Sequence, residues 1–153
     1  MSVNLPGYLA SGTIIRSRFV TRVNGLANTT AATAYKVKQS VSGDIPVGVA
    51  DVRVNVLPGS TAAGTTDPLP AATDGQPIWV YRDTEAALLE AGAAITAGQF
   101  LKPDSVGRGV PLDGTNTSTT QWYGARAEEN ASAAGQLIVV QVITGATRYN
   151  FSS

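Results

Sequence analysis

The apolar residues of this chain occur in short runs, rich in Val and Ile, that end at Gly, Pro, Asn or Asp. In TIIRSRFVTRV, residues 13–23, apolar and polar side chains alternate with a period of two. Strands show this period because successive side chains point to opposite faces of a sheet. The pattern therefore predicts an all-β fold, built as a compact small β-barrel or sandwich.

The clearest strand is expected over residues 13–23. Its two faces would differ, because alternate side chains of an extended segment share a face. One face would carry Ile15, Ser17, Phe19, Thr21 and Val23, and the other Arg16, Arg18 and Arg22. YKVKQSV, residues 35–41, repeats the scheme with Tyr35, Val37 and Val41 opposite Lys36 and Lys38. The two strands are expected to lie side by side with their basic faces outward.

A change of phase marks the next strand. IPVGVADVRVNVL, residues 45–57, alternates in one phase through Val49 and in the opposite phase from Val52. A strand changes phase only where it gains an extra residue or a bend, so a bulge is predicted near Ala50 and Asp51.

Two more strands are expected over QPIWVYR, residues 76–82, and GQLIVVQVIT, residues 135–144. The second is apolar on both faces over Leu137 to Val140, which predicts a central strand rather than an edge strand.

The secondary structure of DTEAALLEAG, residues 83–92, is ambiguous. Its Ala, Leu and Glu residues favour a helix that Asp83 can cap, yet the segment is short and lies between strand signals.

Residues 93–114, AAITAGQFLKPDSVGRGVPLDG, combine short apolar runs with turn residues. This combination predicts a tight β-meander. Its buried positions are expected at Ile95, Phe100, Leu101, Val110 and Leu112, and its reversals at Gly98, Pro103–Asp104 and residues 107–109.

The chain of 153 residues is expected to form a single β domain. Residues 57–77, LPGSTAAGTTDPLPAATDGQP, form a Gly/Pro/Thr-rich loop that is too long for a hairpin connection. They are interpreted either as a flexible surface loop or as a segment that becomes ordered against a neighbouring subunit. Residues 1–12 are expected to form an extended N-terminal arm, and residues 146–153 a C-terminal tail.

The chain contains no cysteine and no histidine. Disulfides, Cys/His metal sites and mechanisms that use a Cys or His side chain are therefore excluded. Glu128 and Glu129 would point to opposite faces of a strand, and a solvated turn explains Asp83 and Glu85 as well as an acid/base pair does. We therefore expect no enzyme activity, no cofactor and no metal.

The formal net charge is zero, but residues 1–56 carry six Lys and Arg against two Asp. A nucleic-acid binder shows a stronger basic face interleaved with aromatic residues, so no direct nucleic-acid partner is expected. The uneven charge instead favours docking on an acidic neighbour. The N-terminus lacks the pattern of a signal peptide, and no apolar stretch approaches the ~20 residues that span a bilayer, so no membrane partner is expected.

The C-terminal half resembles that of the small bacteriophage head-decoration or capsid-cement proteins. The similar segments are GAAITAGQFLKPDSVGRGVPL and, after it, QWYGARAEENASAAGQLIVVQVI. In that family an apolar-Gly-Asp-Gly meander precedes a Gly-Xaa-Ala strand, an Ala/Gly turn and a final Val-rich strand. Upstream, SGTIIRSRFV and DIPVGVADV are similar to the family's N-terminal half. Residues 57–77 and the C-terminal ATRYNFSS depart from the family pattern.

The resemblance implies a non-enzymatic virion protein, made in the host cytoplasm, on the outer surface of a phage capsid. There it would bridge subunits of the major capsid protein, as a homotrimer. It also favours a strand over a helix for EAALLEA. The residues expected at interfaces are the basic residues of the first strands and the apolar residues of the two ends, namely Leu5, Tyr8, Arg16, Arg18, Arg22, Lys36, Lys38, Tyr149 and Phe151.

A second function stays open, a receptor- or carbohydrate-binding β-module of a phage tail or spike. Soluble glycan binders commonly use exposed aromatic residues in a groove of Asp and Asn. Sugar binding that depends on Trp79 or Trp122 would favour this alternative over a cement protein.

Overall fold

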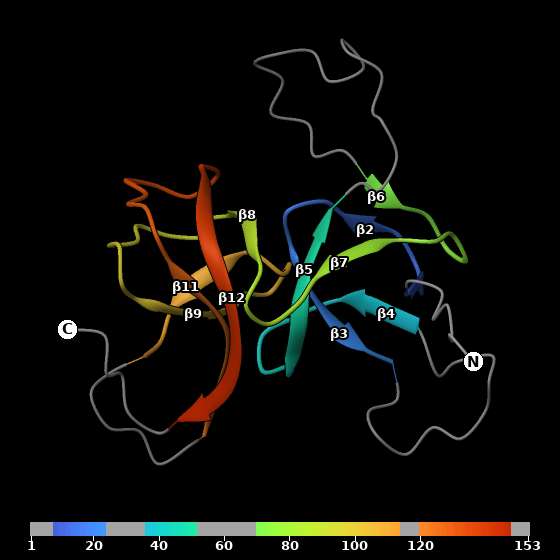
Figure 1. Cartoon of the computed structure of the whole chain (residues 1–153), viewed down its shortest axis with the longest axis horizontal. Helices are drawn as coiled ribbons and strands as arrows, with labels where there is room; N and C mark the ends of the chain where they lie inside the picture. The colour runs from blue at the N-terminus through green and yellow to red at the C-terminus, as the bar shows by residue number, and fades with distance from the viewer. Residues whose placement is uncertain (1–7, 24–35, 52–69, 114–119, 148–153) are drawn as a thin grey trace, which may run out of the picture.

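The computed structural model describes residues 8–23, 36–51, 70–113 and 120–147, and within these ranges every regular element is a β-strand (Figure 1). The strands are β1 (Leu9–Ala10), β2 (Ile14–Ile15), β3 (Phe19–Arg22), β4 (Lys36–Gln39), β5 (Pro46–Asp51), β6 (Pro70–Ala72), β7 (Trp79–Tyr81), β8 (Ala86–Glu90), β9 (Phe100–Pro103), β10 (Gly109–Pro111), β11 (Gln121–Ala127) and β12 (Leu137–Thr147). The predicted all-β fold class is confirmed.

The strands form two five-stranded sheets and one two-stranded ribbon. The N-terminal sheet has the order β1-β4-β3-β5-β7, and the C-terminal sheet the order β10-β9-β11-β12-β8. The ribbon pairs β2 with β6. Neighbouring strands run antiparallel except β1 and β4, which are parallel. Figure 1 shows the two sheets in separate halves of the molecule, with β5 at their boundary.

β3 and β5 are buried on both faces because they separate two hydrophobic cores. Phe19 and Val49 point into the first core, while their neighbours Val20 and Ala50 point into the second. The first core joins the two sheets and contains Phe19, Val49, Ala87, Leu89, Ala91, Ile95, Leu101, Ala125, Ala127, Ala131, Ile138, Val140 and Val142. The second lies between the N-terminal sheet and the ribbon and contains Ala10, Ile14, Val20, Val37, Ala50, Ala72, Ile78 and Val80.

The expected single strand over residues 13–23 is wrong, because the chain turns at Ser17. Ser17 has a φ of 60°, a left-handed conformation that interrupts an extended segment. Its N–H donates to the carbonyl of Ala50 at 2.7 Å, which fixes the turn against β5. β2 therefore joins the ribbon and β3 joins the N-terminal sheet. The expected division into an apolar and a basic face does not hold either.

The bulge in β5 lies earlier than predicted. Val20 pairs with Gly48 and Thr21 pairs with Pro46, so Val47 is the extra residue in the register. Gly48 faces β7 so closely that a Cβ there would lie 2.1 Å from the carbonyl oxygen of Tyr81. The alternation of apolar residues reports neither the bulge nor this close approach of β5 and β7. The second phase of the segment, from Val52, lies outside the described residues.

Several other expectations are confirmed. β4 lies beside β3, and β12 is central because it pairs with both β11 and β8. Residues 86–90 form the strand β8 and not a helix. β9 and β10 form the hairpin of the predicted meander, with left-handed turns at Gly98 and Gly107. Within it Ile95, Leu101 and Leu112 are buried as expected, whereas Phe100 and Val110 are only half-buried.

The folded body extends into all three segments that were expected to lie outside it. Leu9 and Ala10 of the predicted arm pair with β4 as β1. β6 and the turn at residues 73–76, both inside the predicted long loop, pair with β2 and with Ala10. Ala146 and Thr147 of the predicted tail pair with β11. These pairings are made by backbone groups, which leave no apolar pattern in the sequence.

An ion pair joins the two halves at the Ser17 turn. Because Ser17 reverses the local alternation, the Arg18 side chain points inward, where Nε donates to Oε2 of Glu90 at 2.6 Å. Its Nη1 donates to the carbonyl of Val106 at 2.8 Å. Backbone bonds flank the pair: Glu90 N–H donates to Ser17, and Phe19 N–H donates to Gly107. The N-terminal turn, the edge of β8 and the β9–β10 hairpin are thus tied at one point.

Arg18→Met is expected to lower the free energy of unfolding by roughly 3 kcal/mol, because it leaves the Glu90 carboxylate without its partner in a largely buried site. The matched control is Lys38→Met, since Lys38 pairs with Asp44 at 3.7 Å and its side chain is 47% exposed. That change should cost less than about 1 kcal/mol. Urea unfolding followed by tryptophan fluorescence measures both. Equal effects of the two substitutions would show that the Arg18 pair is not structural.

Candidate interaction surfaces

The basic residues of the first strands do not form the single outer face that was predicted. Arg18 is only 6% exposed and pairs with Glu90, so its expected place on the surface is wrong. Arg22 stands opposite Val37 in the register, on the same face as the buried Val20. Lys38 stands opposite Thr21, on the other face of the sheet. The register of β3 with β4 separates Arg22 from Lys38, because Thr21 stands opposite Lys38, and the turn at Ser17 leaves Arg18 outside β3.

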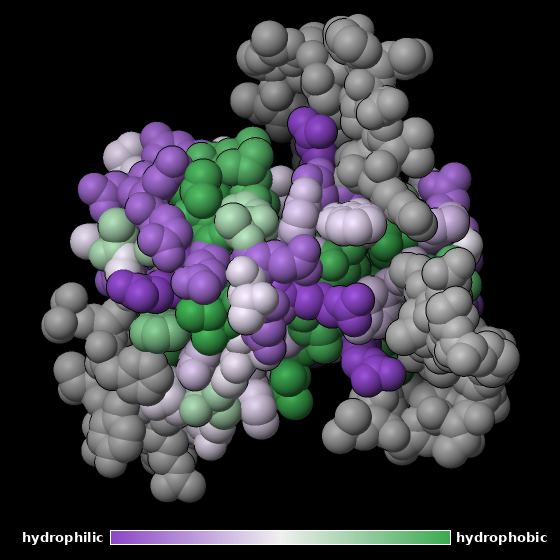
Figure 2. Space-filling model, in the orientation of Figure 1, coloured by the Kyte–Doolittle hydropathy of each residue, from purple (hydrophilic) through white to green (hydrophobic). Residues whose placement is uncertain are grey.

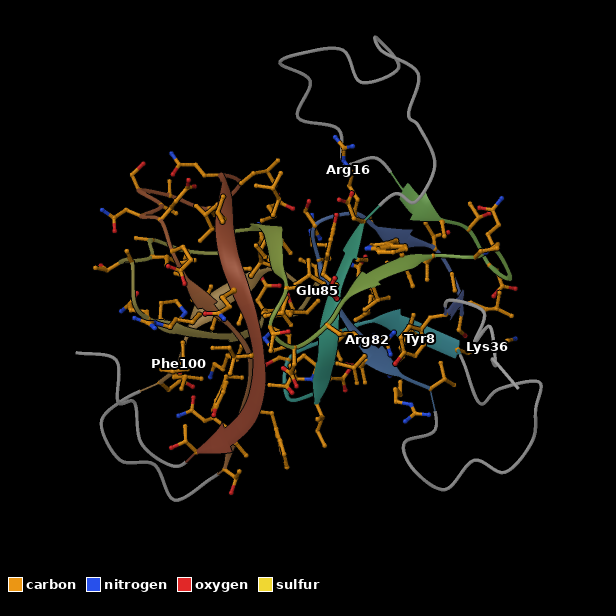
Figure 3. All side chains as sticks on the ribbon, in the orientation of Figure 1. Tyr8, Arg16, Lys36, Arg82, Glu85 and Phe100 are labelled. Atoms are coloured by element: carbon orange, nitrogen blue, oxygen red, sulfur yellow. The ribbon has the colours of Figure 1, made fainter. Side chains whose placement is uncertain are left out.

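The remaining basic side chains fall into two places. Arg16 lies at the tip of β5, and Lys36 lies at the start of β4 in another part of the molecule (Figure 3). Lys36 and Lys38 are two residues apart on β4 and therefore share a face. Of the predicted basic surface, only these two lysines lie together on one face of a described strand.

Of the four predicted terminal anchors, the described residues include only Tyr8. Its ring packs against the second core, and the guanidinium carbon of Arg82 lies 5.6 Å from the ring centroid, within cation–π range (Figure 3). Tyr8 thus has a role inside its own subunit. Leu5, Tyr149 and Phe151 lie outside the described residues, and their contact with a neighbour stays a prediction.

The carboxylates considered for chemistry hold turns. Asp83 accepts hydrogen bonds from the Thr144 N–H at 2.7 Å and from its hydroxyl at 3.0 Å. Glu85 accepts one from the Arg82 N–H at 2.9 Å, across the left-handed Thr84. Glu129 accepts one from the Val139 N–H at 3.1 Å. Among the described residues, no three acidic side chains lie close enough together to bind a metal ion. The described part of the chain also contains no helix that is long and apolar enough to cross a membrane.

The phenol of Tyr81 has a pKa above the ordinary tyrosine value. Its ring packs at the border of the first core, and burial raises the pKa of its phenol. The negative charge of Asp51, its hydrogen bond with the phenol, and the charge of Glu85 raise that pKa further. All these causes stabilise the neutral phenol.

An exposed apolar face lies on β8 and β12. Leu88 stands opposite Val139 in the register, and Leu137 is two pairs further along, opposite Glu90 and on the same face. Leu88 is 47% exposed and Leu137 is 50% exposed. We call these three residues the β8 edge patch; Figure 2 shows apolar surface over the upper parts of the two strands. This surface was not predicted, although the apolar run at Leu137 to Val140 carries its signal, since half of those side chains must point away from the core.

β8 is also an edge strand of its sheet, and among the described residues no strand pairs with its outer side. Val142 N–H donates to Glu85 and Ala91 N–H donates to Gln136, so the odd-numbered residues of β8 bond to β12. The backbone groups of Ala86 and Leu88 therefore point to the outer edge. Such an edge favours association with another chain.

Trp122 lies between two surface hollows. The first has a volume of about 610 Å³ and is lined by Ile45, Pro46, Val47, Asp83, Trp122 and Thr144, among others. The second has about 460 Å³ and is lined by Asp44, Lys102, Asp113, Gln121 and Trp122, among others. Trp79, the other aromatic residue considered for sugar binding, lies on the edge strand β7 and contacts Tyr81 edge to face, with ring centroids 6.2 Å apart.

Comparison with known proteins gives a likeness of fold without a likeness of sequence. No protein-family model matches the chain, and no curated protein matches it. Among solved structures it is similar to the crystal structure of the N base of head fiber gp8.5 in bacteriophage phi29. The TM-score is 0.56 and the sequence identity is 17%, over 95% of each chain. The chain shares this fold along nearly its whole length.

Tyr81→Phe is expected to flatten the loss of stability at high pH. The raised pKa means that the unfolded chain releases the Tyr81 proton more readily than the folded one. The resulting stabilisation is complete below the ordinary tyrosine pKa of about 10 and is lost as pH rises through the folded pKa. Urea midpoints measured between about pH 8 and pH 11 should fall less steeply for the variant than for the wild type. Identical slopes would contradict the assignment.

Proposed function

We propose that this chain is a structural protein of a bacteriophage head, bound to the outer surface of the capsid. The observation that carries the proposal is the match of fold, over 95% of both chains, to the base of a phage head fiber. The resemblance of its segments to capsid-cement proteins supports the finer statement that it bridges subunits of the major capsid protein. In this role the protein would act by binding to the capsid, for which an all-β body with exposed surfaces is sufficient and no catalytic site is required.

The docking surface we propose on the capsid side includes Lys36 and Lys38. They share one face of β4, and Lys38 is 47% exposed even though it pairs with Asp44. Exposed charges steer association with an acidic partner and are screened by salt over about 8 Å at physiological ionic strength. Arg18 is excluded from this surface by its burial.

The β8 edge patch supports the proposed homotrimer. It combines exposed Leu88 and Leu137 with the outward backbone groups of an edge strand. Burial of such leucines contributes about 25 cal/mol for each Å² of apolar surface removed from water. A ring of three copies covers the patch of each subunit with a surface of the next.

Heads prepared without this protein are expected to release their DNA earlier than complete heads when they are heated or diluted abruptly from high salt. A ligand that binds only the intact shell stabilises it by about 2.7 kcal/mol per site when its free concentration is ~100 times its dissociation constant. Because one shell has many such sites, the stabilisation free energies add up to a large resistance of the shell to rupture. The release of DNA, followed with an intercalating dye, measures the effect, and purified protein added back should restore the resistance.

The matched variant for this experiment is Lys36→Glu with Lys38→Glu, which should restore resistance less well and bind more weakly at low salt. Equal rescue by this variant would place the contact elsewhere on the protein. If bare heads retain DNA as well as complete heads, or if heads never assemble without the protein, the cement role is refuted.

Leu88→Lys with Leu137→Lys is expected to convert the trimer into a monomer, because the interface would have to bury two charges. Light scattering coupled to size-exclusion chromatography measures the mass. Val106→Lys is the control, since Val106 is 40% exposed and lies outside the patch. A protein lacking residues 1–7 and 148–153 tests the terminal anchors separately. A monomeric wild type, or a trimer that survives the double substitution, would rule out this interface.

One observation favours the alternative function, a receptor- or carbohydrate-binding module. Trp122 is 38% exposed between two hollows with polar walls. Sugar binding that requires Trp122, in a protein that does not bind heads, would select the alternative.

A further inference from the structure

The position of Trp122 follows from the way β11 packs. Gly124, two residues along β11, lies so close to the N-terminal sheet that a Cβ there would be 2.6 Å from the Phe19 ring and 2.7 Å from Pro46. Alternate residues share a face, so Trp122 is on this inward face, just beyond the point where the two sheets touch. It is a large apolar side chain on the face toward the partner sheet, and yet it is 38% exposed.

The first hollow places an apolar wall opposite polar groups. Ile45, which is 50% exposed, and Pro46 line it together with the indole. Asp83 lies at the same hollow, held in place by its two hydrogen bonds from Thr144. An apolar wall and a carboxylate in a fixed position together can orient a small ligand in a cleft.

The second hollow contains a rigid polar array. Gln121 is only 8% exposed; its Oε1 accepts bonds from the Asp113 N–H at 2.7 Å and from Lys102 Nζ at 3.1 Å. Its Nε2 donates to the Asp113 carbonyl at 2.9 Å. Lys102 also pairs with the Asp113 carboxylate, whose side chain stays 72% exposed. The buried amide thus fixes a cation and an accessible carboxylate beside the indole.

We infer that the two hollows on either side of Trp122 form one binding site for a neutral oligosaccharide. The sugar rings would stack on the indole, and their hydroxyl groups would donate to the Asp113 and Asp83 carboxylates and accept from Lys102. The indole N–H of Trp122 would donate to a further hydroxyl. This inference does not rest on the role at the phage head.

The charges around the site select the class of ligand. The carboxylates of Asp44, Asp83 and Asp113 are offset by Lys102 and Arg82. An array of both signs suits hydroxyl groups, which donate and accept, better than a phosphate or an ammonium group. Volumes of about 610 and 460 Å³ fall within the range of ligand-binding clefts, and their common wall at Trp122 suits a chain of several sugar rings.

The test uses an array of neutral hexose and N-acetylhexosamine oligosaccharides of two to six residues. The wild-type chain is expected to bind members of this array, with the affinities of the wild type and of every variant then measured by isothermal titration calorimetry. Trp122→Ala should weaken binding at least tenfold. Asp113→Asn should weaken it by about tenfold, as expected when a hydrogen bond to a charged group is lost. Trp122→Phe should retain most of the affinity.

Trp79→Ala is the matched control, because Trp79 is 41% exposed and lies outside both hollows; it should bind like the wild type. Circular dichroism and the urea midpoint show whether each variant is folded. Binding to heads should be unchanged in Trp122→Ala, which separates this site from the capsid contact. The inference is overturned if no oligosaccharide on the array binds the wild type, or if Trp122→Ala binds as tightly as Trp79→Ala.

Discussion

The ion pair between Arg18 and Glu90 is the contact on which the arrangement of the two sheets depends. It exists because Ser17 takes a left-handed conformation and turns Arg18 inward, between the edge of β8 and the β9–β10 hairpin. A largely buried guanidinium requires its carboxylate and its carbonyl partner at the same time, since an unpaired charge there is costly. The pair therefore requires three distant parts of the chain to meet, and backbone bonds at Ser17, Phe19 and Gly107 complete the joint.

The same joint determines which surfaces remain for binding. β3 and β5 are covered on both faces by the two cores, so neither offers a broad outer face. The exposed surfaces are instead at the periphery: the lysines of β4, the β8 edge patch, and the hollows at Trp122 where the sheets diverge. The proposed contacts with a shell, with other copies and with a ligand would each use a different one of these three surfaces.

Nearly the whole chain has the same fold as the phage head fiber base, although the two sequences are only 17% identical. Such a fold tolerates extensive sequence change because its requirements are few: small residues where strands approach closely, left-handed residues at turns, and apolar side chains at core positions. Gly48 and Gly124 illustrate the first requirement, since a Cβ at Gly48 would clash with β7 and a Cβ at Gly124 with Phe19 and Pro46 of the facing sheet. Gly107 illustrates the second, with a φ of 83° beside the Phe19 carbonyl.

Four features can be predicted from the local sequence: the all-β class, the meander at β9 and β10, the central place of β12 and the pairing of β3 with β4. Each depends on local alternation or turn residues, which a period of two records directly. Other features depend on contacts between distant segments: the burial of Arg18, the bulge at Val47, the pairing of residues 9–10 and 70–72 with other strands, and the exposure of Leu88 and Trp122. These depend on which strand comes to lie against which face. A period-two pattern says that a residue lies on one of two faces, but it cannot say which of them another part of the chain will cover.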